Sequence, residues 1–267
     1  MSNLTRDDYS DYCDRSPLLI SSKQRSLCRL HPKVMAIVAR GIRLAIDECQ
    51  SRFAANRWNC STVAQDLILS DSQVSPASQP FGDFMRQPIR ERAFLNAIIA
   101  AGLAQAMTKA CSAGELPEEC SCDRKIRSKS NKGRIEWVAC SDDIDYGARF
   151  SRDFTDNFDG ESDATSTIYM HNNEVGRRVF KSATEITCTC PNGENGLCQT
   201  KRCWKHLGTF ADVSDELMKR YESATHVQRS NKDPHKLRPV RRGVRRPKRK
   251  DLVFIDESPD YCQRDSR

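Results

Sequence analysis

Thirteen cysteines, most of them in close groups, constrain this chain of 267 residues more than any other feature. The groups are Cys49 and Cys60; Cys111, Cys120 and Cys122; and Cys188, Cys190, Cys198 and Cys203. In a cytosolic protein such groups usually bind metal ions, whereas in an oxidising compartment they form disulfides. Glycosylation sequons at Asn3 and Asn59 favour the secretory route. We therefore expect a secreted, extracellular protein with a disulfide-stapled fold.

The sequence predicts no membrane insertion. Residues 1–10 are polar and lack the apolar core of a signal peptide. The longest uncharged apolar run, residues 93–108, is too short to span a bilayer. We expect a processed or engineered form rather than the primary translation product.

Apolar residues at three- and four-residue steps predict a mostly helical chain. The expected helices cover residues 31–56, 89–110, about 141–158, 163–182 and 210–221. The alanine-rich segment 89–110 is apolar on much of its circumference and is the expected central helix. Ser141 is the expected N-cap of the next helix, with Asp142 and Asp143 in its first turn. The segment 171–173 is polar, which is unusual for a buried turn. Its Asn172-Asn173 pair fits either a polar site or, as we favour, a hydrogen bond that satisfies helix packing.

From residue 184 the sequence changes to the period of a β-hairpin. An alternating strand, a turn and a return strand are expected over residues 185–190, 191–196 and 197–204. Cys198 can close the turn against Cys190, whereas Cys203 needs a bulge or a strand exit before it can meet Cys188. A four-sulfur zinc site is the alternative, although Cys-x-Cys is less usual for zinc than Cys-x-x-Cys. We favour disulfides, because a zinc site would leave the other nine cysteines unexplained.

The sequence offers little on which catalysis could rest. Its five histidines are scattered, and it contains neither Gly-x-Ser-x-Gly nor His-Glu-x-x-His. We predict that the protein is not an enzyme, with no catalytic residue, metal ligand or cofactor, and that it acts by binding other proteins.

The net charge of +7 is concentrated near the C-terminus, where residues 238–250 hold eight basic and no acidic residues. A nucleic-acid binder spreads basic charge over a folded face, so we predict no nucleic-acid partner. The run has three interpretations: a solvated linker, a heparan sulfate site, or a furin-like protease site at Arg246-Pro-Lys-Arg249. The basic residues singled out are Arg241, Arg242, Arg245, Arg246, Lys248, Arg249 and Lys250.

A series of motifs, in order along nearly the whole chain, resembles the Wnt family of secreted signalling ligands. The motifs are Leu27-Cys-Arg-Leu-His-Pro32, Glu48-Cys-Gln50, Arg57-Trp-Asn-Cys-Ser61, Glu91-Arg-Ala-Phe94, Ala110-Cys-Ser-Ala-Gly-Glu-Leu116, Cys140-Ser-Asp-Asp-Ile-Asp-Tyr-Gly-Ala-Arg-Phe-Ser151, His171-Asn-Asn-Glu174, Thr200-Lys-Arg-Cys-Trp204 and Ser258-Pro-Asp-Tyr-Cys262. The resemblance implies a mainly α fold, a disulfide-rich helical bundle with projecting β-hairpins.

The resemblance also implies a division of the chain and a disulfide pattern. The implied parts are an N-terminal segment (1–30), a helical domain (31–225) with its hairpin at 184–204, a basic linker (226–261), and the start of a truncated cysteine-rich domain (262–267). The implied bridges are Cys13–Cys28, Cys49–Cys60, Cys111–Cys120, Cys122–Cys140, Cys188–Cys203 and Cys190–Cys198. On this pattern, truncation of the last domain is expected to leave Cys262 unpaired.

One departure from the family concerns lipidation. Wnts carry a Cys-His-Gly-x-Ser-Gly-Ser-Cys hairpin tip, whose last serine receives a mono-unsaturated fatty acyl chain that enters a groove on the Frizzled receptor. Here Leu197 stands in place of that serine, and no serine occurs between Cys190 and Cys198. The resemblance therefore implies a non-lipidated ligand, similar to a divergent insect type. Its expected receptor-facing tip is Asn192, Gly193, Glu194, Asn195, Gly196 and Leu197.

The resemblance leaves two functions open. In the first, the protein binds Frizzled-class receptors, with a lipoprotein-receptor-related co-receptor, and regulates signalling. In the alternative, it is an antagonist or decoy that occupies receptor or heparan sulfate without activating a signal.

Overall fold

The computed structural model describes residue 13 and residues 21–61, 87–123, 135–137, 141–157, 164–190, 201–230, 233–241 and 243–263. The helices in this part are α2 (Ser22–Leu30), α3 (Pro32–Arg52), α5 (Arg90–Ser112), α6 (Ile144–Thr155), α7 (Ala164–Ser182) and α8 (Phe210–Glu222). The strands are β1 (Ile135–Trp137), β2 (Thr184–Thr189), β3 (Lys201–Leu207), β4 (Thr225–Ser230), β5 (Asp233–Pro239) and β6 (Val253–Phe254). The predicted mainly α fold is confirmed.

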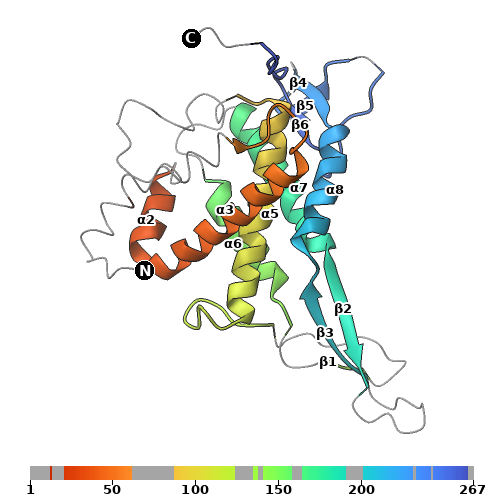
Figure 1. Ribbon diagram of the computed structural model, residues 1–267. Coiled ribbons are helices and arrows are strands. Elements are labelled where there is room, and N and C mark those ends of the chain that lie inside the picture. Colours follow the sequence, from red (N-terminus) through yellow and green to blue (C-terminus); the bar gives the residue numbers. More distant parts are fainter. Residues whose placement is uncertain are drawn as a thin grey trace.

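Helix α5 lies at the centre of the bundle, as its composition predicts. It contacts α3, α6, α7 and α8, and Figure 1 shows it running through the middle of the helices. It is long and apolar enough to cross a membrane, but 89% of its apolar window is buried inside the fold. Such burial is typical of the core helix of a folded domain.

Glycine residues allow α3 and α7 to pack against α5 with their backbones in close contact. A Cβ atom built on Gly176 of α7 would lie 1.9 Å from the carbonyl oxygen of Ala97. A Cβ atom on Gly102 of α5 would lie 2.5 Å from the carbonyl oxygen of Gly41 in α3. Neither position has room for a side chain, so α3 and α7 are fixed against α5 by direct backbone contact.

Helix α6 begins later than predicted, and its N-cap is Asp143 rather than Ser141. The Asp143 carboxylate accepts a hydrogen bond from the amide of Tyr146 at 2.8 Å, which satisfies one of the unpaired donors of the first turn. Ser141 is instead paired with Asp123 in an isolated β-bridge. That bridge keeps Ser141 extended, so the chain cannot turn into a helix there.

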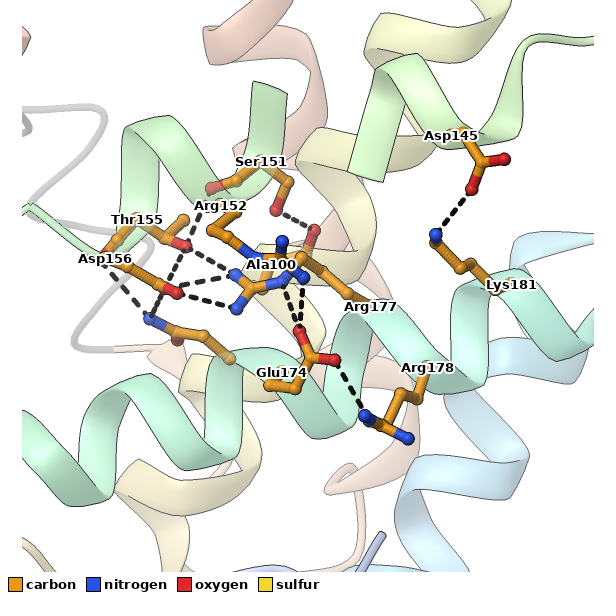
Figure 2. Close-up of polar contacts among 11 residues, drawn as sticks. Ala100, Asp145, Ser151, Arg152, Thr155, Asp156, Glu174, Arg177, Arg178 and Lys181 are labelled. Carbon is orange, nitrogen blue, oxygen red and sulfur yellow. Dashed lines mark hydrogen bonds and ion pairs between the residues drawn. The ribbon is translucent and has the colours of Figure 1, made fainter. Parts of the chain in front are cut away.

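A cluster of charged side chains joins α6 to α7 (Figure 2). Arg177 of α7 is only 2% exposed, and its guanidinium forms ion pairs with Asp156 at 2.7 Å and Glu174 at 3.1 Å. Arg152 of α6 also pairs with Glu174, at 3.1 Å. Asn173, for which a helix-packing hydrogen bond was the favoured expectation, donates to the Asp156 carboxylate at 2.9 Å. These groups satisfy one another, so the cluster holds the two helices together.

The described strands form two small sheets at opposite ends of the bundle (Figure 1). One has the order β1-β3-β2, with β2 and β3 antiparallel and β1 parallel to β3. In Figure 1 this hairpin projects well beyond the helices. The other sheet has the order β5-β4-β6 and packs at the far end.

The second sheet contains much of the segment that was expected to be a basic linker, residues 226–261. Val227 and Val253 are fully buried and pack with Ile168 and Tyr169 of α7. Asn172 of α7 donates to the carbonyl of Val253 at 2.9 Å and accepts from its amide at 3.0 Å. Much of this segment is therefore folded onto the bundle. Apart from the short run at residues 252–255, few apolar residues in this segment signal burial, and helix α7 supplies the surface that Val227 and Val253 cover.

Candidate functional site

The β2–β3 hairpin is the first candidate site, and a disulfide braces it. Cys188 lies directly opposite Cys203 in the antiparallel register, and the two are bonded with Cα atoms 4.0 Å apart. Cys190 is also disulfide-bonded. These bonds leave none of the three sulfurs as a zinc ligand. Cys198 and the expected receptor-facing tip, residues 192–197, lie outside the described residues, and so does Leu197.

One buried carboxylate anchors the base of the hairpin to the central helix. The side chain of Asp142 is 8% exposed and accepts hydrogen bonds from the amide of Leu207 at 2.9 Å and the hydroxyl of Ser112 at 2.6 Å. Lys109 forms an ion pair with the same carboxylate at 2.9 Å. Burial disfavours the ionised form, but the hydrogen bonds outweigh it, so the pKa of Asp142 lies below its usual value. Asp142, which the sequence placed in a helical first turn, thus fixes how the hairpin leaves the bundle.

Outside this joint the hairpin is largely solvent-facing. Ile186 of β2 is 57% exposed, which is unusual for a large apolar side chain on a short strand. Thr187 lies within 2.6 Å of His206 Nε2 across the ladder. The hairpin therefore offers an exposed surface on a rigidly anchored stem.

Three more disulfides lie within the described residues. The structure joins Cys13 to Cys28, Cys49 to Cys60 and Cys111 to Cys120, which are pairs that the resemblance implied. Cys122 is disulfide-bonded, and its implied partner Cys140 lies outside the described residues. Cys262 is an exposed free thiol. The sequon residue Asn59 is half-buried, and Asn3 lies outside the described part.

The basic segment is the second candidate site. Its singled-out residues Arg241, Arg245, Arg246, Lys248, Arg249 and Lys250 are all exposed, and Arg242 is not among the described residues. The segment borders a cavity of about 340 Å³ lined by Thr167, His171, Leu237, Arg238, Arg246, Pro247 and Arg249. Sequence reasoning identified most of these arginines but could not place Arg238 and α7 on the opposite wall.

Comparison with known proteins decides the family. The model of the wnt family matches residues 17–267. The chain belongs to the Wnt family. Protein Wnt-2b-A of Xenopus laevis is 38% identical over 256 residues, 95% of this chain and 69% of that protein. Protein Wnt-2b of Homo sapiens is 39% identical over 253 residues, 94% of this chain and 61% of that protein, so the chain spans less than two thirds of its human relative.

Two solved Wnt structures resemble this fold. WNT8A, in a structure of human WLS in complex with WNT8A, has a TM-score of 0.64 at 28% identity and covers 94% of this chain and 75% of that one. The Drosophila WntD N-terminal domain-linker has a TM-score of 0.54 at 23% identity, covering 86% and 98%. The second likeness shows the fold alone, so the narrower resemblance to a non-lipidated insect Wnt stays a prediction. Wnt family members are secreted signalling ligands rather than enzymes, which agrees with the binding role expected from the sequence.

Proposed function

We propose that this protein is a secreted Wnt-type ligand that binds Frizzled-class receptors through the β2–β3 hairpin without a lipid. The observation that supports it is the pairing of a retained brace with a changed tip. Cys188–Cys203 and the buried Asp142 joint hold the stem, while Leu197 offers no hydroxyl for an ester. Because a rigid stem is already ordered in the free protein, we expect it to lose little conformational entropy on binding.

Loss of the acyl chain changes how such a ligand must gain its affinity. Each methylene group buried from water contributes about 0.8 kcal/mol, so a long chain contributes far more than one leucine side chain. We expect a freely soluble ligand whose receptor contact comes from the protein surface of the hairpin tip, residues 192–197, rather than from the stem. A lipoprotein-receptor-related co-receptor is a second proposed partner, and the β5-β4-β6 end of the bundle is far enough from the hairpin to leave both ends accessible at once (Figure 1).

Two measurements test the proposal. Mass spectrometry of the peptide from Cys190 to Cys198, from protein secreted by cells that acylate other Wnts, is expected to show no fatty acyl group. Binding to an immobilised Frizzled ectodomain is then measured for the wild type and for a tip variant, Leu197→Asp. The matched control is Ile186→Asp, which places the same charge on the exposed stem.

We expect the tip variant to bind at least about tenfold more weakly, and the stem variant to bind within about threefold of the wild type. An acylated peptide would contradict the lipid-free part of the proposal. Absence of any Frizzled binding by the wild type, or equal weakening by both variants, would contradict the role of the tip.

A further inference from the structure

We propose that Arg246-Pro-Lys-Arg249 is a restrained processing site, at which a furin-like serine protease hydrolyses the peptide bond after Arg249. The Asp251 carboxylate slows the cut by closing the turn that contains this bond. In the reaction water supplies a hydroxyl group to the carbonyl carbon of Arg249 and a proton to the departing amine of Lys250. The choice of protease rests on the secretory route of the proposed function, whereas the accessibility of the site does not.

The site lies on an exposed stretch between β5 and β6. Residues 244–248 have no regular secondary structure, and Arg246, Lys248 and Arg249 are exposed. Pro247 disfavours the helical conformation in the residue before it and so biases Arg246 toward an extended backbone. Such exposed stretches are the preferred sites of proteolytic nicking, because the chain enters a protease cleft there without unfolding a core.

The basic side chains of the site are available to a protease. Those of Arg246, Lys248 and Arg249 have no hydrogen bond or ion pair with another described residue. Arg245, just before them, is instead paired with Asp251. Proteases that select basic sequences hold each cation against carboxylates of their cleft by charge-assisted hydrogen bonds. Because the three cations leave no partner in the protein, such binding breaks no existing ion pair among the described residues.

The bond to be cut lies in the middle of a closed turn. The amide of Asp251 donates to the carbonyl of Lys248 at 3.0 Å, the hydrogen bond of a β-turn whose central residues are Arg249 and Lys250. The Asp251 carboxylate also accepts from the Lys248 amide at 2.8 Å. Arg220 of α8 donates to the carbonyl of Lys250. A protease binds its substrate extended, so this turn must open before the cut, and the rate follows the population of the open form.

After the cut, the segment that begins at residue 250 stays bound to the bundle. Leu252 and Val253 are fully buried, and the carbonyl of Leu252 accepts from the Thr225 amide at 2.9 Å. The Ile255 amide donates to the carbonyl of Pro88 at 2.8 Å. No disulfide placed within the described residues crosses the cut. Processing therefore converts one chain into two pieces that noncovalent contacts hold together.

Digestion of the full chain with purified furin tests the position of the site. Mass spectrometry identifies the new ends, and we expect the main cut after Arg249. Arg246→Ala removes one basic side chain of the site, and the matched control Arg241→Ala removes the same charge from the same segment outside it. We expect Arg246→Ala to be cut at least about tenfold more slowly than the wild type, and the control to be cut within about twofold of it.

Asp251→Ala tests the restraint, because it keeps the four-residue site and removes the carboxylate that closes the turn. We expect the folded variant to be cut about tenfold faster than the wild type. Synthetic peptides of residues 241–256, with and without the same substitution, are the control. They have no folded turn to open, so a rate difference between them reports only the preference of the protease for the residue at position 251.

The product is examined by gel filtration and by denaturing electrophoresis without reductant. We expect the two pieces to elute together under native conditions and to separate when denatured. Dissociation of the segment from residue 250 as soon as the bond is cut would overturn the noncovalent retention.

Three results would overturn the processing site itself: an uncut wild type, a main cut elsewhere, or equal slowing by Arg246→Ala and Arg241→Ala. A rate gain for Asp251→Ala that is no larger in the folded protein than in the peptides would overturn the restraint. None of these measurements involves Frizzled or the hairpin tip, so the processing site and the proposed function can fail separately.

Discussion

Replacement of Asp142 by alanine is expected to destabilise the protein by about 3 kcal/mol at pH 7. The carboxylate has two largely buried neutral donors, the Leu207 amide and the Ser112 hydroxyl. A hydrogen bond to a charged group contributes about 1.5–3 kcal/mol, and alanine leaves both donors without their acceptor. Lys109 is 48% exposed, so solvent screening reduces its ion pair to about 0–1 kcal/mol.

The pH dependence of this loss follows from the direction of the pKa shift. The folded-state pKa of Asp142 lies below the value of about 3.8 expected in the unfolded chain. The stabilisation is therefore fully present above the unfolded pKa and disappears as the pH falls through the folded one. The gap between wild type and variant should be constant near neutrality and should narrow below about pH 4.

The assay is urea unfolding followed by circular dichroism at pH 7 and at pH 3. Asp145→Ala is the matched control, because Asp145 lies on the neighbouring α6, is 72% exposed and pairs with the exposed Lys181. We expect that control to cost about 0–1 kcal/mol. If Asp142→Ala costs no more than Asp145→Ala, or if its cost is the same at both pH values, the carboxylate is not the joint that we describe.

Three further changes test the packing around α7. Gly176→Ala puts a methyl group 1.9 Å from the Ala97 carbonyl oxygen, so we expect a loss of at least about 2 kcal/mol and a lower Tm; an unchanged Tm would refute the backbone contact. Asn172→Ala removes both hydrogen bonds to β6, with an expected cost of about 2 kcal/mol and faster hydrogen exchange of the β6 amides. Arg177→Met leaves Asp156 without its buried cation and should cost about 3 kcal/mol at pH 7; a variant as stable as the wild type in urea would contradict this.

The sequence alone predicts the helices, the hairpin and the family with good fidelity, because each depends on signals that are close together in the chain. The apolar face and alanine content of residues 89–110 are enough to identify the central helix α5. Alternation and a glycine-rich turn identify the hairpin strands. The presence of leucine rather than serine at position 197 is also evident from the sequence alone. Leucine has no hydroxyl group with which to form an ester.

Polar joints could not be predicted in the same way, because their partners are remote in sequence. Asp142 looks like a favourable first-turn acid, yet it binds Leu207, a residue 65 positions away. Ser141 looks like an N-cap, but pairing with Asp123 keeps it extended. A short polar side chain satisfies a local cap and a distant amide equally well, so only tertiary packing decides between them.

The cysteine content by itself predicted a disulfide-stapled chain, and the motifs around those cysteines predicted its family. Tertiary structure decided what the basic C-terminal segment becomes. In sequence it is a run of like charges with a few apolar residues, the pattern of a solvated linker. In the structure Val227 and Val253 find an apolar surface on α7, and Asp251 closes the turn beside it. Burial of Val227 and Val253 against α7, a helix remote in sequence, is what folds this charged segment onto the bundle.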